Sequence, residues 1–397
     1  MRCRACGGAH LEPLLDLGSM PLAGGFLGSE NDCADEATYE LRIDICADCC
    51  LVQIVDPVDP DVLFQDYSFS ATTVPALVEH FSGYAAWLKD RFDPSFVVEF
   101  GANDGVLIEP LTKLGVRGLG VDRSENITAL ARSRGHDVMT GAFTPELARD
   151  IRSEHGPADI VTGSNVFAHN ADPTVILEAA RLALPDDGLL ALEMMYAGDL
   201  LEKLQWDTLY HEHLTFYSLS TIRRLLASHG FHVIAAERIP MHGGSVRVVA
   251  SLDAARPAAP AVEELVRWES SIGLDKIDRW RQFARDADRS IEIVAATFER
   301  LARSASIWGY GAAGKATMWV NACHMAYLGG VVDASPLRAG KLMPGTHTPI
   351  VSPEAFRAAN PDYVLVTAWN YLDGIRRNED WYRGIWSTPL PELTFHR

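Results

Sequence analysis

Short apolar runs separated by helically spaced segments fill residues 74–251. The runs are continuous and bounded by polar or glycine residues, as buried parallel strands are; they lie at 96–100, 118–121, 160–162 and 189–193. From Val74 to Phe92 the apolar spacing is helical, and 231–235 and 245–251 resemble a closing pair of strands. Strands that alternate with helices in this way predict a doubly wound α/β sheet.

The remainder of the chain repeats this type of pattern once. Residues 253–260 are rich in alanine and proline, which is typical of a linker, and 262–302 form a charged stretch with helical spacing. A second strand-helix-strand unit begins at 306–309. We therefore expect two separate α/β units joined by a helical connector.

Two Cys-x-x-Cys pairs lie within the first fifty residues, at Cys3 and Cys6 and at Cys46 and Cys49. Four thiolates complete a tetrahedral shell with no open position, so the pairs predict a structural zinc site. His10 replacing one thiolate is a weaker alternative, and free or disulfide-bonded pairs are another. The total of seven cysteines is odd and argues against a disulfide framework.

Composition limits the classes of partner. The net charge of −18 disfavours nucleic acid and anionic membranes, because both would repel the chain. No apolar run approaches the roughly 18 residues of a membrane span, and the cysteines begin directly at the N-terminus without an apolar signal core. We expect a cytoplasmic protein, and the sequence does not indicate an oligomeric state.

The first glycine-rich turn reads Glu99-Phe-Gly101-Ala-Asn103-Asp-Gly105 and lies between a predicted strand and helix. Glycines let the backbone approach a ligand, and the helix N-terminus offers free N–H groups. The next strand ends in Asp122, where a carboxylate can accept hydrogen bonds from a ribose diol. This order of elements predicts a nucleoside-binding site, although the motif departs from G-x-G-x-x-G.

Polar residues follow the later strands of the same unit. Asn165 and His169 come after the third strand, and Tyr210, His211, Glu212 and His213 come after the fourth. Histidine accepts protons near neutral pH, and a neighbouring glutamate can orient it. A polar surface loop is the alternative; a metal site is less favoured, because the segment lacks the spacing of H-E-x-x-H. His242, followed by two glycines, is a further candidate for this site.

A second glycine-rich turn carries Gly309, Gly311 and Lys315, with Asp333 about twenty residues later. Taken alone, this pattern is that of a dinucleotide-binding unit and favours a nicotinamide oxidoreductase. No separate constellation for hydride transfer accompanies it.

Together these motifs, in this order and over essentially the whole chain, resemble those of nucleotide-sugar C-methyltransferases. The motifs are the cysteine pairs, E-F-G-x-N-D-G, Asn165-x-x-x-His169, Y-H-E-H-x-x-F-Y-S, H-G-G-S and G-Y-G-A-x-G-K. The resemblance implies deoxysugar biosynthesis in antibiotic pathways. It also implies a Rossmann-like central domain that binds S-adenosylmethionine and a dTDP-linked 4-keto-hexose between the central and C-terminal domains.

The resemblance also implies roles and boundaries. His213 would be the general base, oriented by Glu212, while Tyr210, His169 and Asn165 would shape the pocket or stabilise the enolate. For the second glycine-rich turn our own hypothesis is that it and Lys315 contact the diphosphate of the nucleotide sugar, since such a turn can cradle phosphate in either type of ligand. The expected domains are a zinc module (1–70), an S-adenosylmethionine-binding domain (71–255) whose cofactor contacts include Asn165 with the first glycine-rich turn, a helical connector (256–302) and a nucleotide-sugar-binding α/β domain (303–397).

One departure concerns the segment after the zinc module, where related enzymes carry Tyr-x-Tyr-x-Ser-Ser. Here Tyr67 is followed by Phe69, so a second hydroxyl is missing and the substrate can differ. Two other readings stay open on the sequence: an NAD-dependent oxidoreductase that uses the second glycine-rich turn, and a non-catalytic zinc-containing nucleotide-binding protein.

Overall fold

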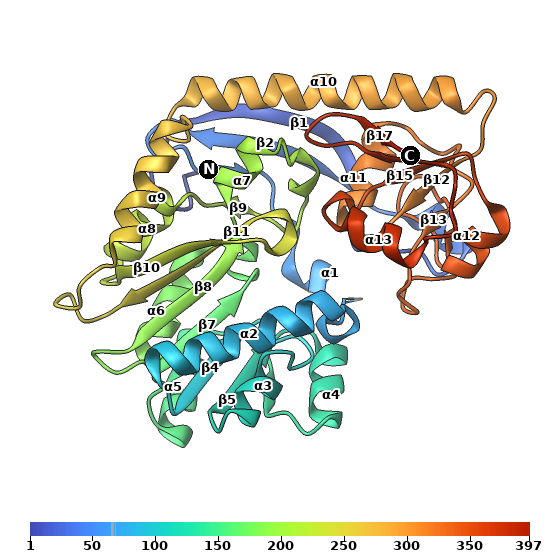
Figure 1. The fold of residues 1–397 in the computed structure, drawn as a ribbon. Coiled ribbons are helices and arrows are strands. Elements are labelled where there is room, and N and C mark those ends of the chain that lie inside the picture. The colour runs from blue at the N-terminus through green and yellow to red at the C-terminus, as the bar shows by residue number, and fades with distance from the viewer. Residues whose placement is uncertain (65–66, 68) are drawn as a thin grey trace.

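The fold is taken from a computed structural model, which describes residues 1–64, 67 and 69–397. Ser68, which lies within the Tyr67–Ala71 segment, is outside the described residues. The described chain forms three sheets in sequence, and the long helix α10 (Ile277–Leu301) runs along one side of the molecule from the central region toward the C-terminal one (Figure 1).

The first sheet contains the cysteine module and one strand from far along the chain. Its order is β1-β2-β3-β9, and all neighbouring pairs are antiparallel. Its bounds are β1 (Leu11–Pro21), β2 (Thr38–Cys46), β3 (Val52–Ile54) and β9 (Thr215–Phe216), with η1 (Glu30–Asp35), α1 (Pro60–Phe64) and η2 (Ala71–Thr73) alongside. Val52 pairs with Phe216. The segment directly after His213 is therefore part of the zinc module's sheet.

The central sheet has the order β10-β11-β8-β7-β4-β5-β6. Its strands are β4 (Phe96–Phe100), β5 (Arg117–Asp122), β6 (Val138–Thr140), β7 (Ile160–Ser164), β8 (Leu189–Met195), β10 (His232–Ile239) and β11 (Ser245–Ser251). Its helices are α2 (Pro75–Phe92), α3 (Ile108–Lys113), α4 (Glu125–Ser133), α5 (Pro145–His155), α6 (Pro173–Ala183) and α8 (Leu219–Ser228). Only β11 is antiparallel to its neighbours, so the predicted α/β sheet and its closing strand pair are confirmed.

Helices cover both faces of this sheet, which explains why its strands read as continuous apolar runs. Leu77 and Leu88 of α2 pack against Val97 of β4 on one face. On the other face Val98 shares a core with Leu177 of α6. Carboxyl ends of parallel strands meet at one edge, where ligands bind in such folds.

The connector departs from the sequence prediction in one respect. The stretch expected as helical over 262–302 is two helices, α9 (Pro260–Ser271) and α10, broken around Gly273 at φ +77°. That backbone conformation suits glycine and ends a right-handed helix. Trp280, Phe283 and Phe298 lie on the buried side of α10, at the helical spacing that identified the stretch.

The third sheet has the order β14-β13-β12-β15-β16-β17 and is parallel except for β17. Its elements are β12 (Ile307–Tyr310), α11 (Gly314–Ala322), β13 (Val331–Val332), β14 (Ile350–Val351), α12 (Pro353–Ala359), β15 (Tyr363–Val366), η6 (Trp369–Tyr371), α13 (Leu372–Asn378), β16 (Ile385–Thr388) and β17 (Thr394–His396). The strand order reverses between β12 and β15, which is where such sheets bind ligands.

No helix among the described residues combines the length and the apolar character that crossing a membrane requires.

Candidate active site and zinc centre

The four predicted cysteine ligands lie together. The Sγ atoms of Cys3 and Cys49 are 3.5 Å apart, those of Cys6 and Cys46 are 3.6 Å apart, and all four lie within 4.8 Å of one another. A tetrahedral zinc with Zn–S bonds of about 2.3 Å needs sulfurs about 3.8 Å apart, so the donor set fits the ion. His10 instead contacts Asp48 at 3.1 Å and does not replace a thiolate.

The first glycine-rich turn is shaped by left-handed backbone and close packing. Gly101 has φ +69°, and a Cβ there would lie 2.6 Å from the Val166 side chain, which excludes any larger residue. Asn103 and Gly105 also have positive φ. Both carboxylate oxygens of Asp122 accept backbone N–H groups, from Asn103 at 2.9 Å and from Ser124 at 2.9 Å. The acidic residue at the end of β5 thus fixes the turn as well as facing the sheet edge.

Two buried oxygen atoms at this edge have no hydrogen-bond partner among the described residues: Oε2 of Glu99 and Oδ1 of Asn165. Glu99 lies near the end of β4, and Asn165 follows β7 at φ +54°. Burial and the neighbouring Asp122 raise the pKa of Glu99 well above its usual range. Buried polar atoms without partners are rare and costly. They fit a ligand that brings its own ammonium or hydroxyl donors.

The side chain of Asn103 serves a purpose that the sequence does not reveal. Its Oδ1 accepts the N–H of Ala71 at 2.9 Å, and its Nδ2 donates to the carbonyl of Phe69 at 3.1 Å. Asn103 therefore ties the segment after Tyr67 to the turn through its side chain, while its backbone N–H binds Asp122.

Asp104 is a residue that sequence reasoning missed. It is fully buried, and its Oδ2 accepts hydrogen bonds from Ser70, Thr72 and Arg134, while Oδ1 has no partner among the described residues. Nothing local in the sequence marks it, because its partners lie about thirty residues away on either side.

His213 is held with one ring nitrogen free for chemistry. Its Nδ1 lies 2.7 Å from the carbonyl oxygen of Thr208, at the end of η4 (Trp206–Thr208). A carbonyl only accepts, so Nδ1 carries the proton and Nε2 keeps a lone pair. Burial and the nearby His169 lower the pKa of His213 well below its ordinary value. The imidazole is therefore neutral and able to accept a proton.

The predicted polar residues converge around this imidazole. The ring of Tyr210 lies 4.0 Å from that of His213, and His169 stacks on His213 at 5.3 Å. Phe64 of α1 stacks on the other side of His169 at 5.8 Å. Burial lowers the pKa of His169 to about 4. His169 is thus uncharged at neutral pH, and its ring packs beside that of His213.

Among the described residues Glu212 forms a side-chain hydrogen bond with Tyr67, not with His213, which the family resemblance implied that it orients. Its Oε2 accepts the hydroxyl of Tyr67 at 3.4 Å, while the orienting partner of His213 is the Thr208 carbonyl. Burial raises the pKa of Glu212 to about 7, and the Tyr67 hydrogen bond opposes that rise. The glutamate therefore titrates near neutral pH beside the base. A backbone carbonyl as orienter leaves no signature in the sequence.

His211 points away from these residues. Its Nε2 lies 3.2 Å from the carbonyl of Tyr39 in β2. Within the described part of the chain, the one group of potential ligands close enough for a metal ion is the four cysteines. The less favoured metal reading of the 211–213 segment therefore gains no support.

The second glycine-rich turn lies against Tyr210, in the segment that carries His213. A Cβ on Gly314, at the start of α11, would lie 2.8 Å from Cζ of Tyr210. Nζ of Lys315 lies 3.4 Å from the carbonyl of His242 and 3.5 Å from Oδ1 of Asn370. The structure thus brings His242, Lys315 and Tyr210 to one place.

The other residues predicted for this site, Gly309, Gly311 and Asp333, make their contacts within the C-terminal domain. Gly309 lies inside β12, where a Cβ would lie 3.2 Å from Val331, and a Cβ on Gly311 (φ +97°) would lie 2.5 Å from Ala368. Asp333 accepts the Ser335 N–H at 2.8 Å and pairs with Arg338 at 3.2 Å. Among the described residues, no direct contact joins any of these three to His213.

Asp207 is a second residue that the sequence did not reveal. It is fully buried in η4, and its Oδ2 accepts indole N–H groups from Trp319 of α11 at 3.0 Å and Trp369 of η6 at 2.8 Å. Burial raises its pKa. Trp319 follows β12 and Trp369 follows β15, the two strands between which the order of the C-terminal sheet reverses. The Asp207 carboxylate thus links the segment that carries His213 to both sides of this point.

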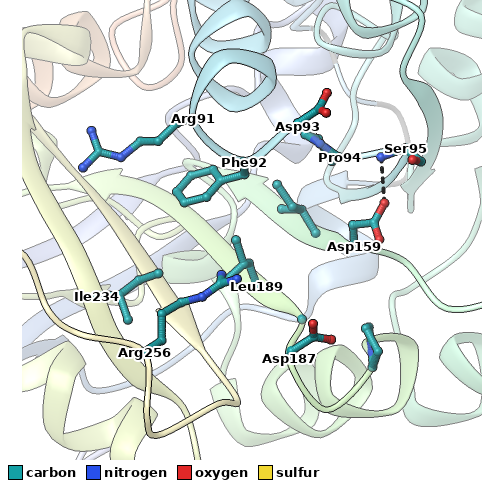
Figure 2. Close-up of a pocket in the computed structure, with 13 residues that line it drawn as sticks. Arg91, Phe92, Asp93, Pro94, Ser95, Asp159, Asp187, Leu189, Ile234 and Arg256 are labelled. Atoms are coloured by element: carbon teal, nitrogen blue, oxygen red, sulfur yellow. Dashed lines mark hydrogen bonds between the residues drawn. The ribbon is translucent and has the colours of Figure 1, made fainter.

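A separate cavity of about 440 Å³ lies elsewhere (Figure 2). It is bounded by the end of α2 and by the starts of β4, β7 and β8, with Asp159 accepting the Ser95 N–H at 2.7 Å. These are the amino ends of the parallel strands. The cavity contains no predicted site residue and lies at the edge opposite to the one where ligands bind.

Comparison with known proteins agrees with this three-part arrangement. Family models match a zinc binding domain at residues 3–64, a methyltransferase domain at 74–236 and a C-methyltransferase C-terminal domain at 240–391. C-methyltransferase NovU of Streptomyces niveus is 34% identical over 404 aligned residues, which cover 98% of this chain and 95% of NovU. The chain belongs to the C-methyltransferase family.

More distant relatives of this C-methyltransferase cover only part of it. Ubiquinone biosynthesis O-methyltransferase of Caulobacter sp. strain K31 is 31% identical over 104 residues, or 26% of this chain and 41% of that protein. Among solved structures, magnesium protoporphyrin IX methyltransferase of Synechocystis with bound SAH is 21% identical, with a TM-score of 0.35 over 44% of this chain and 82% of that chain. The PH0226 protein of Pyrococcus horikoshii is 17% identical, with a TM-score of 0.38 over 48% of this chain and 97% of that chain.

Proposed function

We propose that this C-methyltransferase transfers the methyl group of S-adenosylmethionine to a carbon beside the ketone of a nucleotide-linked keto-deoxysugar of the dTDP type. The observation that carries the proposal is the hydrogen bond that orients His213. Its Nδ1 is bound to the Thr208 carbonyl, which leaves the lone pair of this buried side chain on Nε2. A carbon nucleophile must be made by removing a proton, and a neighbouring carbonyl makes that proton acidic enough.

S-adenosylmethionine is the methyl donor of this site, and structural zinc is the metal of the N-terminal module. The Glu99–Gly105 turn, Asp122 and Asn165 would hold the donor: the turn permits close approach, Asp122 lies where a ribose diol would bind, and the unpartnered oxygens of Glu99 and Asn165 match its ammonium and hydroxyl donors. When bound, the donor supplies a methyl group on a sulfonium, which is a good leaving group. The chain's task is then alignment.

The other site residues would serve proton transfer and substrate binding. His213 takes the proton at Nε2, and Glu212, once ionised, stabilises the imidazolium that results. Tyr67 holds Glu212 through its hydroxyl. Tyr210 and His169, whose rings contact that of His213, and His242, whose carbonyl lies 3.4 Å from Nζ of Lys315, would surround the sugar. Gly309, Gly311 and Asp333 remain predictions for the nucleotide side of the substrate.

The dinucleotide alternative is disfavoured by the packing of the second turn. In a dinucleotide-binding unit the pyrophosphate lies on the helix N-terminus, and a free carboxylate binds the ribose. Here the Tyr210 ring lies against Gly314, and Asp333 is paired with Arg338. The non-catalytic alternative gives no reason for a buried imidazole with a free lone pair.

An assay with methyl-labelled S-adenosylmethionine and dTDP-4-keto-6-deoxyglucose tests the proposal. Wild-type enzyme should form a methylated sugar, and His213→Asn should reduce the rate by about 10²–10⁴-fold, the usual contribution of a general base. Binding of S-adenosylmethionine should stay unchanged in the variant. A His213→Asn enzyme with wild-type turnover would remove His213 as the base.

A further inference from the structure

Lys315 lies at the start of α11, and its ammonium contacts His242 of the central domain and two residues of η6. Nζ is 3.4 Å from the carbonyl oxygen of His242, 3.5 Å from Oδ1 of Asn370 and 4.3 Å from the centre of the Trp369 ring. An ammonium has three donors, and both hydrogen bonds that the described residues offer are long. The group is therefore held in place with capacity left for a further acceptor.

The second glycine-rich turn and the Tyr210 ring connect Lys315 to His213. The residue before Lys315 touches the Tyr210 ring, and that ring lies 4.0 Å from the His213 ring. The positive charge of Lys315 also contributes, after burial, to the low pKa of His242 and, after burial and other neighbours, to that of His213. The Lys315 ammonium and the His213 ring thus come from different domains and lie close enough for the charge of one to act on the other.

Deprotonation beside a ketone creates negative charge at the carbonyl oxygen. Nε2 of His213 takes the proton, the C–H electron pair forms a carbon–carbon double bond, and the carbonyl π pair moves onto oxygen. A preorganised cation at that oxygen stabilises the charge in a site that excludes water. We propose that Lys315 is this group: it stabilises the enolate oxygen of the substrate. The inference rests on the proposed function and replaces the diphosphate contact that we expected for Lys315 from the sequence.

A different cation is placed to meet the diphosphate. Arg338 is held by Asp333, and its Nε is buried without a hydrogen-bond partner among the described residues. Its guanidinium lies 5.7 Å from the Phe26 ring and 6.0 Å from the Phe69 ring, on the side of the N-terminal module. Arginine suits phosphate geometry, so Lys315 is not required for that contact.

Exchange of the hydrogens on the carbons beside the ketone for deuterium separates enolate stabilisation from diphosphate binding. The exchange needs the enolate but no methyl transfer. Full-length, zinc-loaded enzyme is incubated in D₂O with dTDP-4-keto-6-deoxyglucose and without S-adenosylmethionine, and NMR follows the protons beside the ketone. Lys315→Gln should slow exchange and kcat by about 10²-fold, as loss of one stabilising donor does elsewhere. The dissociation constant of dTDP should not change, and Lys315→Arg should recover part of the rate.

Lys341→Gln removes a lysine from the same domain and should leave exchange at the wild-type rate. Unchanged binding of S-adenosylmethionine verifies that each variant is folded. Wild-type exchange in Lys315→Gln, or weakened dTDP binding with normal kcat, would overturn the inference. Wild-type enzyme that neither binds dTDP nor exchanges these protons would instead overturn the proposed substrate class, and the Lys315 inference with it.

Discussion

The two glycine-rich turns have similar sequences and different surroundings. Each follows a parallel strand and opens a helix, and each is followed about twenty residues later by an aspartate. At the first turn, Asp122 binds backbone N–H groups, and nearby Glu99 and Asn165 have unpartnered oxygens. At the second, the Tyr210 ring covers Gly314. The comparison teaches that what packs on such a turn, more than its glycines, decides which ligand it can bind.

Alanine at one glycine of each turn should produce opposite effects. In Gly101→Ala the new methyl group would lie 2.6 Å from Val166 at a positive φ, so the turn must shift and binding of S-adenosylmethionine should be lost. In Gly314→Ala the methyl group would lie nearest to Tyr210, 2.8 Å from its Cζ, so cofactor affinity should persist while turnover falls. Calorimetry and a turnover assay on both variants measure this. Equal loss of cofactor affinity in both would contradict the distinction.

The link between the second turn and the catalytic segment depends on Asp207. Asp207→Ala leaves the indole N–H groups of Trp319 and Trp369 without their acceptor, which should lower the free energy of unfolding by about 2–4 kcal/mol. Asp207→Asn retains an acceptor and should cost less. Denaturant unfolding of both variants gives the values. An unchanged stability in Asp207→Ala would mean that the two indoles do not hold the domains together.

Zinc removal should affect the two ligand-binding regions unequally. Cys3→Ser with Cys6→Ser should lower zinc content and loosen the four-stranded sheet, which includes β9 directly after His213. The first turn belongs to another sheet, so S-adenosylmethionine should still bind while methyl transfer declines. Metal analysis, calorimetry and the turnover assay test this together. Full activity without zinc would show that the module does not support the catalytic segment.

The smallest expected effect is a shift in pH dependence. Burial raises the pKa of Glu212 to about 7, so the rate should rise as pH passes through that value and the carboxyl ionises. Tyr67→Phe removes the hydroxyl that opposes this rise, so the pKa of Glu212 should increase further. The rate profile should then move to higher pH by up to about one unit, the equivalent of one hydrogen bond. If the profile does not move, ionisation of Glu212 does not control the rate.

Periodicity and motif order sufficed for the central α/β sheet and for the four clustered cysteines, because both leave local patterns in the sequence. Strands β4 and β11 have the bounds that their apolar runs indicate. Two kinds of contact were beyond reach. One is the backbone acceptor of His213, the carbonyl of Thr208. The other is contact across domains, as with the indoles on Asp207 and the position of Lys315. A backbone acceptor has no residue type, and partners 55 to 162 residues apart leave no spacing to detect.

Titration calorimetry of the wild-type enzyme with S-adenosylmethionine and NAD in parallel tests the account most directly. The packing of the two turns predicts saturable binding of S-adenosylmethionine at one site, lost in Gly101→Ala, and no binding of NAD. Binding of NAD without binding of S-adenosylmethionine would contradict the account, because it would make the second turn the cofactor site.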